Sequence, residues 1–113
     1  NGCLAWRAPD GGSDMVVEHA YIKVVAGQEA DFEAAFAKAE PVLAGAAGCQ
    51  ATALFRDVEQ PGSYLLRVTW ERLEDHLEVF PTSPAGREFA AQIAHFFAEA
   101  PDVRHFAVDA VTV

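Results

Sequence analysis

Residues 63–97 constrain the fold more than any other part of the chain, because their apolar repeat changes from strand-like to helical. Every second residue from Tyr64 to Trp70 is apolar, which predicts a strand with one apolar face. Two helical stripes follow, made of Leu73, Leu77 and Phe80 and then, after Ser83-Pro84, of Phe89, Ile93, Phe96 and Phe97. Trp70 ends the strand and precedes the helices, so we expect a small-molecule pocket where the sheet and the helices meet.

The rest of the chain supplies three more predicted strands and one more helix. Residues 15–25 predict a strand, residues 28–40 an amphipathic helix that Pro41 breaks or restarts, residues 49–57 a second strand, and residues 103–111 the last strand. The predicted apolar faces are Val16, Ala20, Ile22 and Val24; Phe32 and Phe36 of the helix; Cys49, Ala51, Ala53 and Phe55; and Phe106, Val108 and Ala110.

The order of these elements is β-α-β-β-α-β, which predicts an α+β, ferredoxin-like domain. Such a domain has a four-stranded antiparallel sheet covered by helices on one face. The opposite face of each strand is half polar and half apolar, with Tyr21 and Leu65 among its members. A face of that kind suits burial against a second copy, so we expect a homodimer through the sheet faces.

Composition and net charge limit the cellular location and the binding partners that we expect. The chain has 113 residues and a net charge of -9, and neither lysine, Lys23 or Lys38, lies in a basic cluster, which argues against nucleic acid and anionic membranes as partners. No apolar run reaches the roughly 18 residues of a membrane span and no signal peptide is visible, so we expect a cytoplasmic protein. Cys3 and Cys49 fit no ligand or redox spacing and are expected to be free thiols.

Residues 1–14 show no sustained repeat. They contain Pro9, Gly11 and Gly12 and are predicted to be a tail, either an expression remnant or an upstream extension. Met15 is then the expected natural start, and residues 15–113 form a single domain.

An ordered set of residues carries a resemblance to a known family. The set comprises Gly27-Gln28-Glu29 leading to Phe32 and Phe36, Gly48-Cys49, Tyr64-Leu65-Leu66 leading to Trp70-Glu71, Glu74-Asp75-His76, Phe80 through Ser83-Pro84, and Phe96-Phe97 before His105-Phe106. With this set, residues 15–113 resemble the antibiotic biosynthesis monooxygenase (ABM) family of dimeric α/β-barrel proteins.

The resemblance implies a dimeric α/β barrel and an activity. The family includes cofactor-independent monooxygenases that oxidise polycyclic or simple hydroquinones to quinones, with the pocket between the sheet and the helices, and Trp70 matches the family's pocket tryptophan. Other members degrade haem, with an asparagine at about Ala20 and a haem-ligating histidine near Phe89 or Ala90. Neither residue is present here, and the asparagine associated with the hydroquinone branch is also missing, because Asn1 is the only asparagine.

Oxidation by dioxygen without flavin or metal requires the substrate to supply an electron, which phenolates and enolates do far better than their neutral acids. The protein must then remove a proton and exclude water. His76 is the best base in the sequence, with a reference pKa of roughly 6.5. We therefore predict His76 and Trp70 as catalytic residues. The predicted substrate-binding wall consists of Tyr64, Leu66, Val68, Ala20, Ile22, Phe80, Phe89 and Phe106.

Each of these roles has a structural alternative. His76 could be a surface residue of its helix that pairs with Arg72, and Trp70 could be an ordinary core residue. His19 and His105 fall on predicted mixed faces and would belong to a polar network in the dimer interface, and His95 would lie on a helix surface. No metal-ligand spacing is present, so we predict neither a metal nor a cofactor.

Two functions remain open from the sequence. The first is a cofactor-independent monooxygenase that acts on an electron-rich aromatic (hydroquinone-like) or enolisable small metabolite. The second is a non-catalytic dimeric binder of a hydrophobic small molecule. The missing asparagine favours the second function, whereas Trp70 and His76 favour the first. The enzymatic prediction also expects the Trp70 ring to border a cavity and not to fill one.

Overall fold

The computed structural model describes residues 14–109 and 111. The strands are β1 (Val16–Lys23), β2 (Cys49–Arg56), β3 (Ser63–Trp70) and β4 (Asp102–Ala107). The helices are α1 (Glu29–Ala44), the π-helical turn η1 (Asp75–Val79), α2 (Phe80–Thr82), α3 (Pro84–Ile93) and the 3₁₀ turn η2 (Ala94–Phe96). The predicted tail, residues 1–14, lies outside the described residues except for Asp14.

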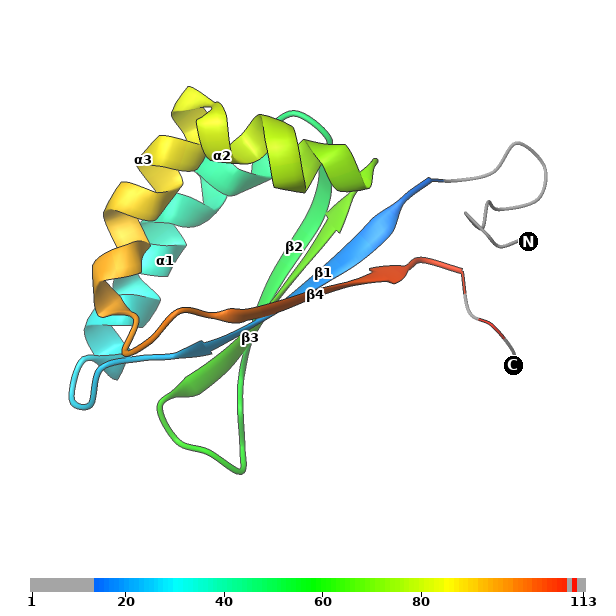
Figure 1. The fold of residues 1–113 in the computed structure, drawn as a ribbon. Helices are drawn as coiled ribbons and strands as arrows, with labels where there is room; N and C mark the ends of the chain where they lie inside the picture. The colour runs from blue at the N-terminus through cyan, green and yellow to red at the C-terminus, as the bar shows by residue number, and fades with distance from the viewer. Residues whose placement is uncertain (1–13, 110, 112–113) are drawn as a thin grey trace.

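One antiparallel sheet forms the base of the domain, with its strands in the order β2-β3-β1-β4. The helices all lie on one side of it, and α1 and α3 pack side by side while the opposite side stays open (Figure 1). The predicted α+β, ferredoxin-like βαββαβ fold is therefore confirmed. Among the described residues, no helix is long and apolar enough to cross a bilayer.

The core lies between the sheet and the helices and is rich in aromatic rings. The inward residues of β1 and β3 alternate as predicted, and Trp70, Val68 and Ile22 are among the most deeply buried side chains. From the helices, Phe32 and Phe36 of α1 and Phe89 of α3 close over them. Burying one such side chain contributes about 1.5–3 kcal/mol, so this layer is the main source of stability.

The first helix runs through the proline that was predicted to break it. Pro41 lies inside α1, which ends at Ala44, and the N–H of Gly45 then bonds to the Pro41 carbonyl. A proline inside a helix costs about 3 kcal/mol. Full burial of Leu43, one turn beyond the predicted end, offsets much of that cost.

The predicted inward face of the second strand was wrong beyond Cys49. An irregularity in the pairing of β2 with β3 lies between Cys49 and Ala51, and an extra residue there exchanges the two faces of the strand. Thr52 and Leu54 therefore face the helices, and Phe55 faces the open side.

The predicted inward face of the last strand was also wrong at Phe106, and Ala110 of that face lies outside the described residues. His105 is paired with Glu18 and so faces the helices, whereas Phe106 is paired with Val17 and faces the open side, with 48% of its surface exposed. The strand ends at Ala107, opposite Val16, the first residue of β1, and not at residue 111; beyond it the Val108 N–H makes one long bond of 3.4 Å to the Met15 carbonyl.

The helical stripe predicted after Trp70 was wrong at Leu77, which is 54% exposed. The turn is π-helical, and the N–H of Phe80 bonds to the carbonyl of Asp75, five residues back. This wider turn brings Asp75, His76 and Phe80 inward in place of Leu77.

The second predicted stripe is confirmed, because Phe89, Ile93 and Phe96 are buried. Its helix begins at a cap in which the Ser83 hydroxyl accepts the N–H of Gly86, with Pro84 in the first turn. Only glycine fits at position 86, because a Cβ atom there would lie 1.8 Å from the Phe80 carbonyl oxygen.

Candidate active site

Glu18 lies on the apolar face of β1 and is only 5% exposed. The indole Nε1–H of Trp70, on the neighbouring strand β3, donates a hydrogen bond of 2.9 Å to Glu18 Oε1. A buried carboxylate is costly unless its oxygens have partners, and the indole N–H supplies one. This pair places a charged group inside the core.

His76 comes from η1 and covers the same tryptophan. The two rings are stacked, with centroids 5.3 Å apart and planes 11° from parallel. His76 Nε2 lies 3.4 Å from Glu18 Oε1, a long contact between a ring nitrogen and a carboxylate oxygen. The π-helical turn is what directs His76 inward, and such turns are frequent at functional sites.

His105, on the edge strand β4, completes a chain of four side chains. Its Nε2 is 2.7 Å from His76 Nδ1, so a single hydrogen is shared between the two rings. We call Trp70, Glu18, His76 and His105 the buried polar chain. It runs from the core to the edge of the sheet.

The surroundings keep both histidines neutral at pH 7. Burial, with repulsion from His105 added, lowers the pKa of His76 to about 4. Burial also lowers the pKa of His105, and it raises the pKa of Glu18 although the hydrogen bond from Trp70 acts in the opposite direction. Perturbed groups that contact one another are typical of catalytic sites, although structural networks produce them too.

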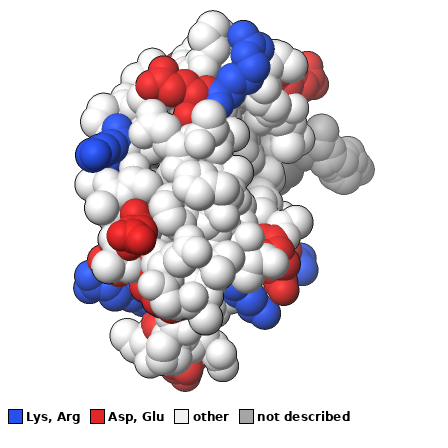
Figure 2. Space-filling model, turned by 90° about the vertical axis from the view of Figure 1, so that its left-hand side faces the viewer, with Lys and Arg blue, Asp and Glu red and all other residues white. Residues whose placement is uncertain are grey.

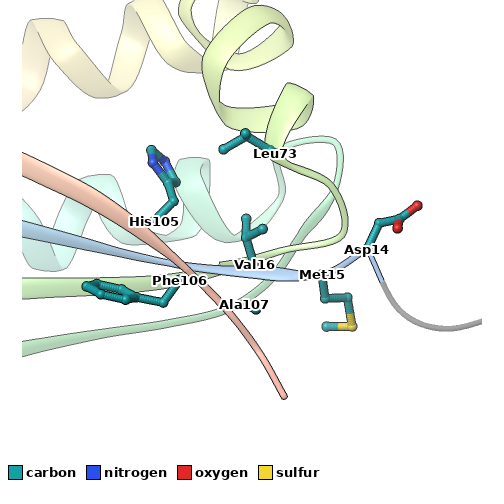
Figure 3. A pocket seen from close by; sticks show the side chains of 7 residues that line it. All are labelled: Asp14, Met15, Val16, Leu73, His105, Phe106 and Ala107. Atoms are coloured by element: carbon teal, nitrogen blue, oxygen red, sulfur yellow. The ribbon is translucent and has the colours of Figure 1, made fainter. Parts of the chain in front are cut away.

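A surface hollow of about 280 Å³ lies at the end of the buried polar chain. It is lined by Asp14, Met15, Val16, Leu73, His105, Phe106 and Ala107. Figure 3 shows His105, Leu73 and Val16 on the helix side of the strands, and Phe106 and Met15 on the other side. We call this feature the terminal hollow.

Trp70 does not border the terminal hollow or the second hollow described below. Its ring is fully buried against Glu18, His76 and Phe80. The sequence led us to expect open space beside this ring. In the structure the space is filled by side chains, and His105 is the member of the chain that reaches a hollow.

The structure brings some of the predicted site residues together and separates others. Phe80 contacts Trp70 and His76 and also Phe89, with ring centroids 5.4, 6.4 and 6.0 Å away. Val68 is the next inward residue on the strand of Trp70. Phe106 is separated from this group, since it lies on the open face, where it contacts His19.

Tyr64 marks the other end of the sheet, six residues or about 20 Å along β3 from Trp70. Its hydroxyl donates a hydrogen bond of 2.7 Å to Glu33, which also binds Arg56 through two bonds. Burial and Glu33 raise the pKa of Tyr64 to about 12. Tyr64 also lines a separate hollow of about 410 Å³, together with Leu54 and Phe55. The predicted residues Ile22, Leu66 and Ala20 are buried in the core along β1 and β3 between the two ends.

Sequence reasoning missed Glu18 and gave His105 to the wrong face. The signal for Glu18 was a charged residue at an inward position of the first strand, between Val16 and Ala20. Among the described residues, no three histidine, cysteine or acidic side chains are grouped as a metal would require. Cys49 has a free thiol whose pKa is raised by burial, and Cys3 lies outside the described residues.

An open four-stranded antiparallel sheet covered by helices on one face places this protein in the class of small ferredoxin-like α+β proteins. The model of the family "Antibiotic biosynthesis monooxygenase" matches residues 15–92, and the chain belongs to this family. It is 39% identical over 92 residues to the uncharacterized protein YczJ of Bacillus subtilis (strain 168), covering 81% of this chain and 97% of YczJ.

Solved structures agree with this assignment. A Bordetella bronchiseptica protein assigned to the antibiotic biosynthesis monooxygenases superposes with a TM-score of 0.82 at 39% identity, covering 87% of this chain and all of the other. SnoaB, a cofactor-independent oxygenase from Streptomyces nogalater, superposes with a TM-score of 0.72 at 19% identity, covering 88% of this chain and 97% of SnoaB. At that identity SnoaB supports the fold alone.

Proposed function

We propose that this chain is a cofactor-independent monooxygenase that acts on an electron-rich aromatic (hydroquinone-like) or enolisable small metabolite. The observation that carries the proposal is the buried polar chain, in which a carboxylate and two neutral histidines are in contact beside the aromatic core. Burying such groups is costly, and their contact with one another supports a catalytic role. The family membership and the oxygenase SnoaB on the same fold support it.

The chemistry needs a base and little else from the protein. Removal of a proton gives a phenolate or enolate, which passes one electron to dioxygen, and the resulting radical pair combines to a peroxide. The carbon that carries the peroxide was a ring C–H of the phenol or a CH₂ of the enolisable substrate, and it keeps one hydrogen. Loss of water from this hydroperoxide leaves a carbonyl there, so one oxygen atom enters the product and the other leaves as water. His76 can serve as the base because it is neutral at pH 7, and His105, which contacts His76 and lines the terminal hollow, lies between it and a substrate there. The apolar layer around it excludes water.

Oxygen uptake with a panel of hydroquinones tests the proposal. The wild-type protein is expected to consume oxygen above the uncatalysed background, and His76→Ala is expected to lose roughly 10²–10⁴-fold in rate, the usual contribution of a general base. His95→Ala serves as the control, because His95 is exposed and does not belong to the buried polar chain. Equal rates in the wild type and His76→Ala would remove His76 from the mechanism.

The second candidate is a non-catalytic dimeric binder of a hydrophobic small molecule. The sequence favours it at one point, because the asparagine associated with the hydroquinone branch of the family is missing here. Calorimetric binding of hydroquinones with no oxygen uptake above background would select this function over the first.

The open face of the sheet is proposed to pair with a second copy and to form the dimeric α/β barrel. Phe55 and Phe106 are 44% and 48% exposed there, and Arg67 lies over the Phe55 ring at 5.2 Å. Large apolar groups rimmed by charges are typical of protein interfaces. We expect a dimer in sedimentation at tens of micromolar, roughly the range of modest dimer affinities, and monomer alone at that concentration would contradict this.

We propose no nucleic-acid partner for this protein. The net charge is -9, and on the face shown in Figure 2 the basic side chains lie toward the edges and between acidic ones. A cytoplasmic location remains a prediction from the sequence.

A further inference from the structure

His105 is the only member of the buried polar chain that also lines a hollow among those described. Its Nε2 is held by His76, and among the described residues no hydrogen bond engages its Nδ1. A ligand in the terminal hollow would therefore meet the ring of His105 and not that of His76.

The positions of the hydrogens in the buried polar chain follow from the donor and acceptor groups that each ring nitrogen contacts. Glu18 Oε1 already accepts the indole N–H, and a carboxylate can only accept, so the proton of His76 is favoured on Nε2, which faces that oxygen. His76 Nδ1 is then an acceptor, and the hydrogen between the two rings belongs to His105 Nε2. Neutral His105 consequently has a lone pair on Nδ1, which makes that atom the basic end of the chain.

We infer that His105 is the base that contacts the substrate in the terminal hollow, and that His76 and Glu18 carry the proton inward from it. The inference rests on the proposed function, because it names the base and the substrate class of that same reaction. It makes His105 the catalytic residue and His76 and Glu18 the groups that act through it.

The transfer balances over three steps. The substrate O–H or C–H bond breaks and an Nδ1–H bond forms on His105, whose Nε2–H passes to His76 Nδ1. The Nε2–H of His76 then passes to Glu18, after the 3.4 Å contact has closed to the roughly 2.7–2.9 Å of a charge-assisted bond. The substrate ends as an anion, both histidines remain neutral, and Glu18 ends as the acid. A negative charge has thereby left the core.

The hollow also indicates the class of substrate. At about 280 Å³ it lies at the lower limit of small-molecule sites, which suits one or two fused rings and not a polycyclic system. Val16, Leu73 and Phe106 give it apolar walls, while Asp14 brings a carboxylate to its lining. From its size and its apolar walls we assign it a small phenol or enolisable ketone.

The experiment measures proton removal without dioxygen. With 2-indanone, a neutral ketone with acidic CH₂ groups, the wild-type protein in D₂O under nitrogen is expected to accelerate exchange of deuterium into the ketone. His105→Gln and Glu18→Gln are each expected to reduce that exchange at least 100-fold, and His95→Gln to leave it unchanged. Added imidazole is expected to restore exchange in His105→Ala, because His105 lines a surface hollow that a ring of that size can enter.

Several results would overturn the inference. Exchange that survives His105→Gln, no acceleration by the wild type, or ¹⁵N chemical shifts placing the His105 proton on Nδ1 would each do so, and the shifts need no substrate and no variant. Exchange under nitrogen without oxygen uptake in air would refute the proposed oxygenase while supporting the relay. Oxygen uptake that is indifferent to His105→Gln would refute the relay alone.

Discussion

Trp70→Ala is expected to destabilise the domain by about 3–5 kcal/mol, the usual cost of truncating a large buried aromatic side chain. The ring is fully buried, and it stacks on His76 and contacts Phe80. Its loss leaves a cavity and also removes the N–H that Glu18 accepts. Urea unfolding monitored by far-UV circular dichroism measures the difference.

Trp70→Phe is the matched comparison for this variant. It retains most of the apolar volume but has no N–H donor, so its cost separates the hydrogen bond to Glu18 from the packing. We expect an intermediate loss, of the order of 1–3 kcal/mol for a buried acceptor left without its partner. A Trp70→Ala protein as stable as the wild type would show that the ring is not part of the core.

The second large effect is on the pH dependence of stability, through His76. Its pKa is about 4 in the folded protein against 6.5 in the unfolded chain, so the unfolded chain binds the proton first as the pH falls. The contribution of His76 is present above about pH 6.5 and is lost progressively down to pH 4, with a full size of up to about 3 kcal/mol. Three groups share this environment: Glu18 on β1, His105 on β4 and His76 itself.

Glu18 titrates with the opposite sign. Burial raises its pKa, so its contribution is present below its unfolded value of 4.5 and is lost as the pH rises through the folded value. The wild-type curve alone therefore mixes Glu18, His76 and His105, whose pKa is also lowered, and a comparison with His76→Gln isolates His76. We expect His76→Gln to lose less stability than the wild type between pH 6.5 and pH 4 in urea unfolding.

His95→Gln is the control for this measurement, because it removes an exposed histidine and should leave the slope unchanged. Parallel curves for the wild type and His76→Gln would show that His76 titrates as it does in the unfolded chain.

Alternation of apolar residues predicted the order of the elements and the inward faces of the first and third strands. These strands are central and covered by helices, so burial alone determines which side chains point inward. The second and fourth strands lie at the edges, and there the rule failed. A local irregularity exchanged the faces of β2, and Phe106 of β4 faces the open side, where a second copy is proposed to cover it.

The sequence predicted only part of the candidate site, because two of the contacts in it depend on backbone geometry. The sequence places His76 six residues after Trp70, which was enough to expect them near each other. The contact with Glu18 depends on the π-helical turn, and the contact with His105 depends on the register of β4 with β1. Neither property follows from an apolar pattern.

The widened turn at Asp75–Val79 has a consequence for comparing family members. A chain with one residue fewer there would close the turn as an ordinary helix and rotate its histidine by about 100°, away from the carboxylate. Two members could therefore share a histidine in an alignment and differ in whether it reaches the interior. The length of this turn, and not the presence of a histidine in an alignment, would distinguish a member whose histidine reaches the buried carboxylate from one whose histidine does not.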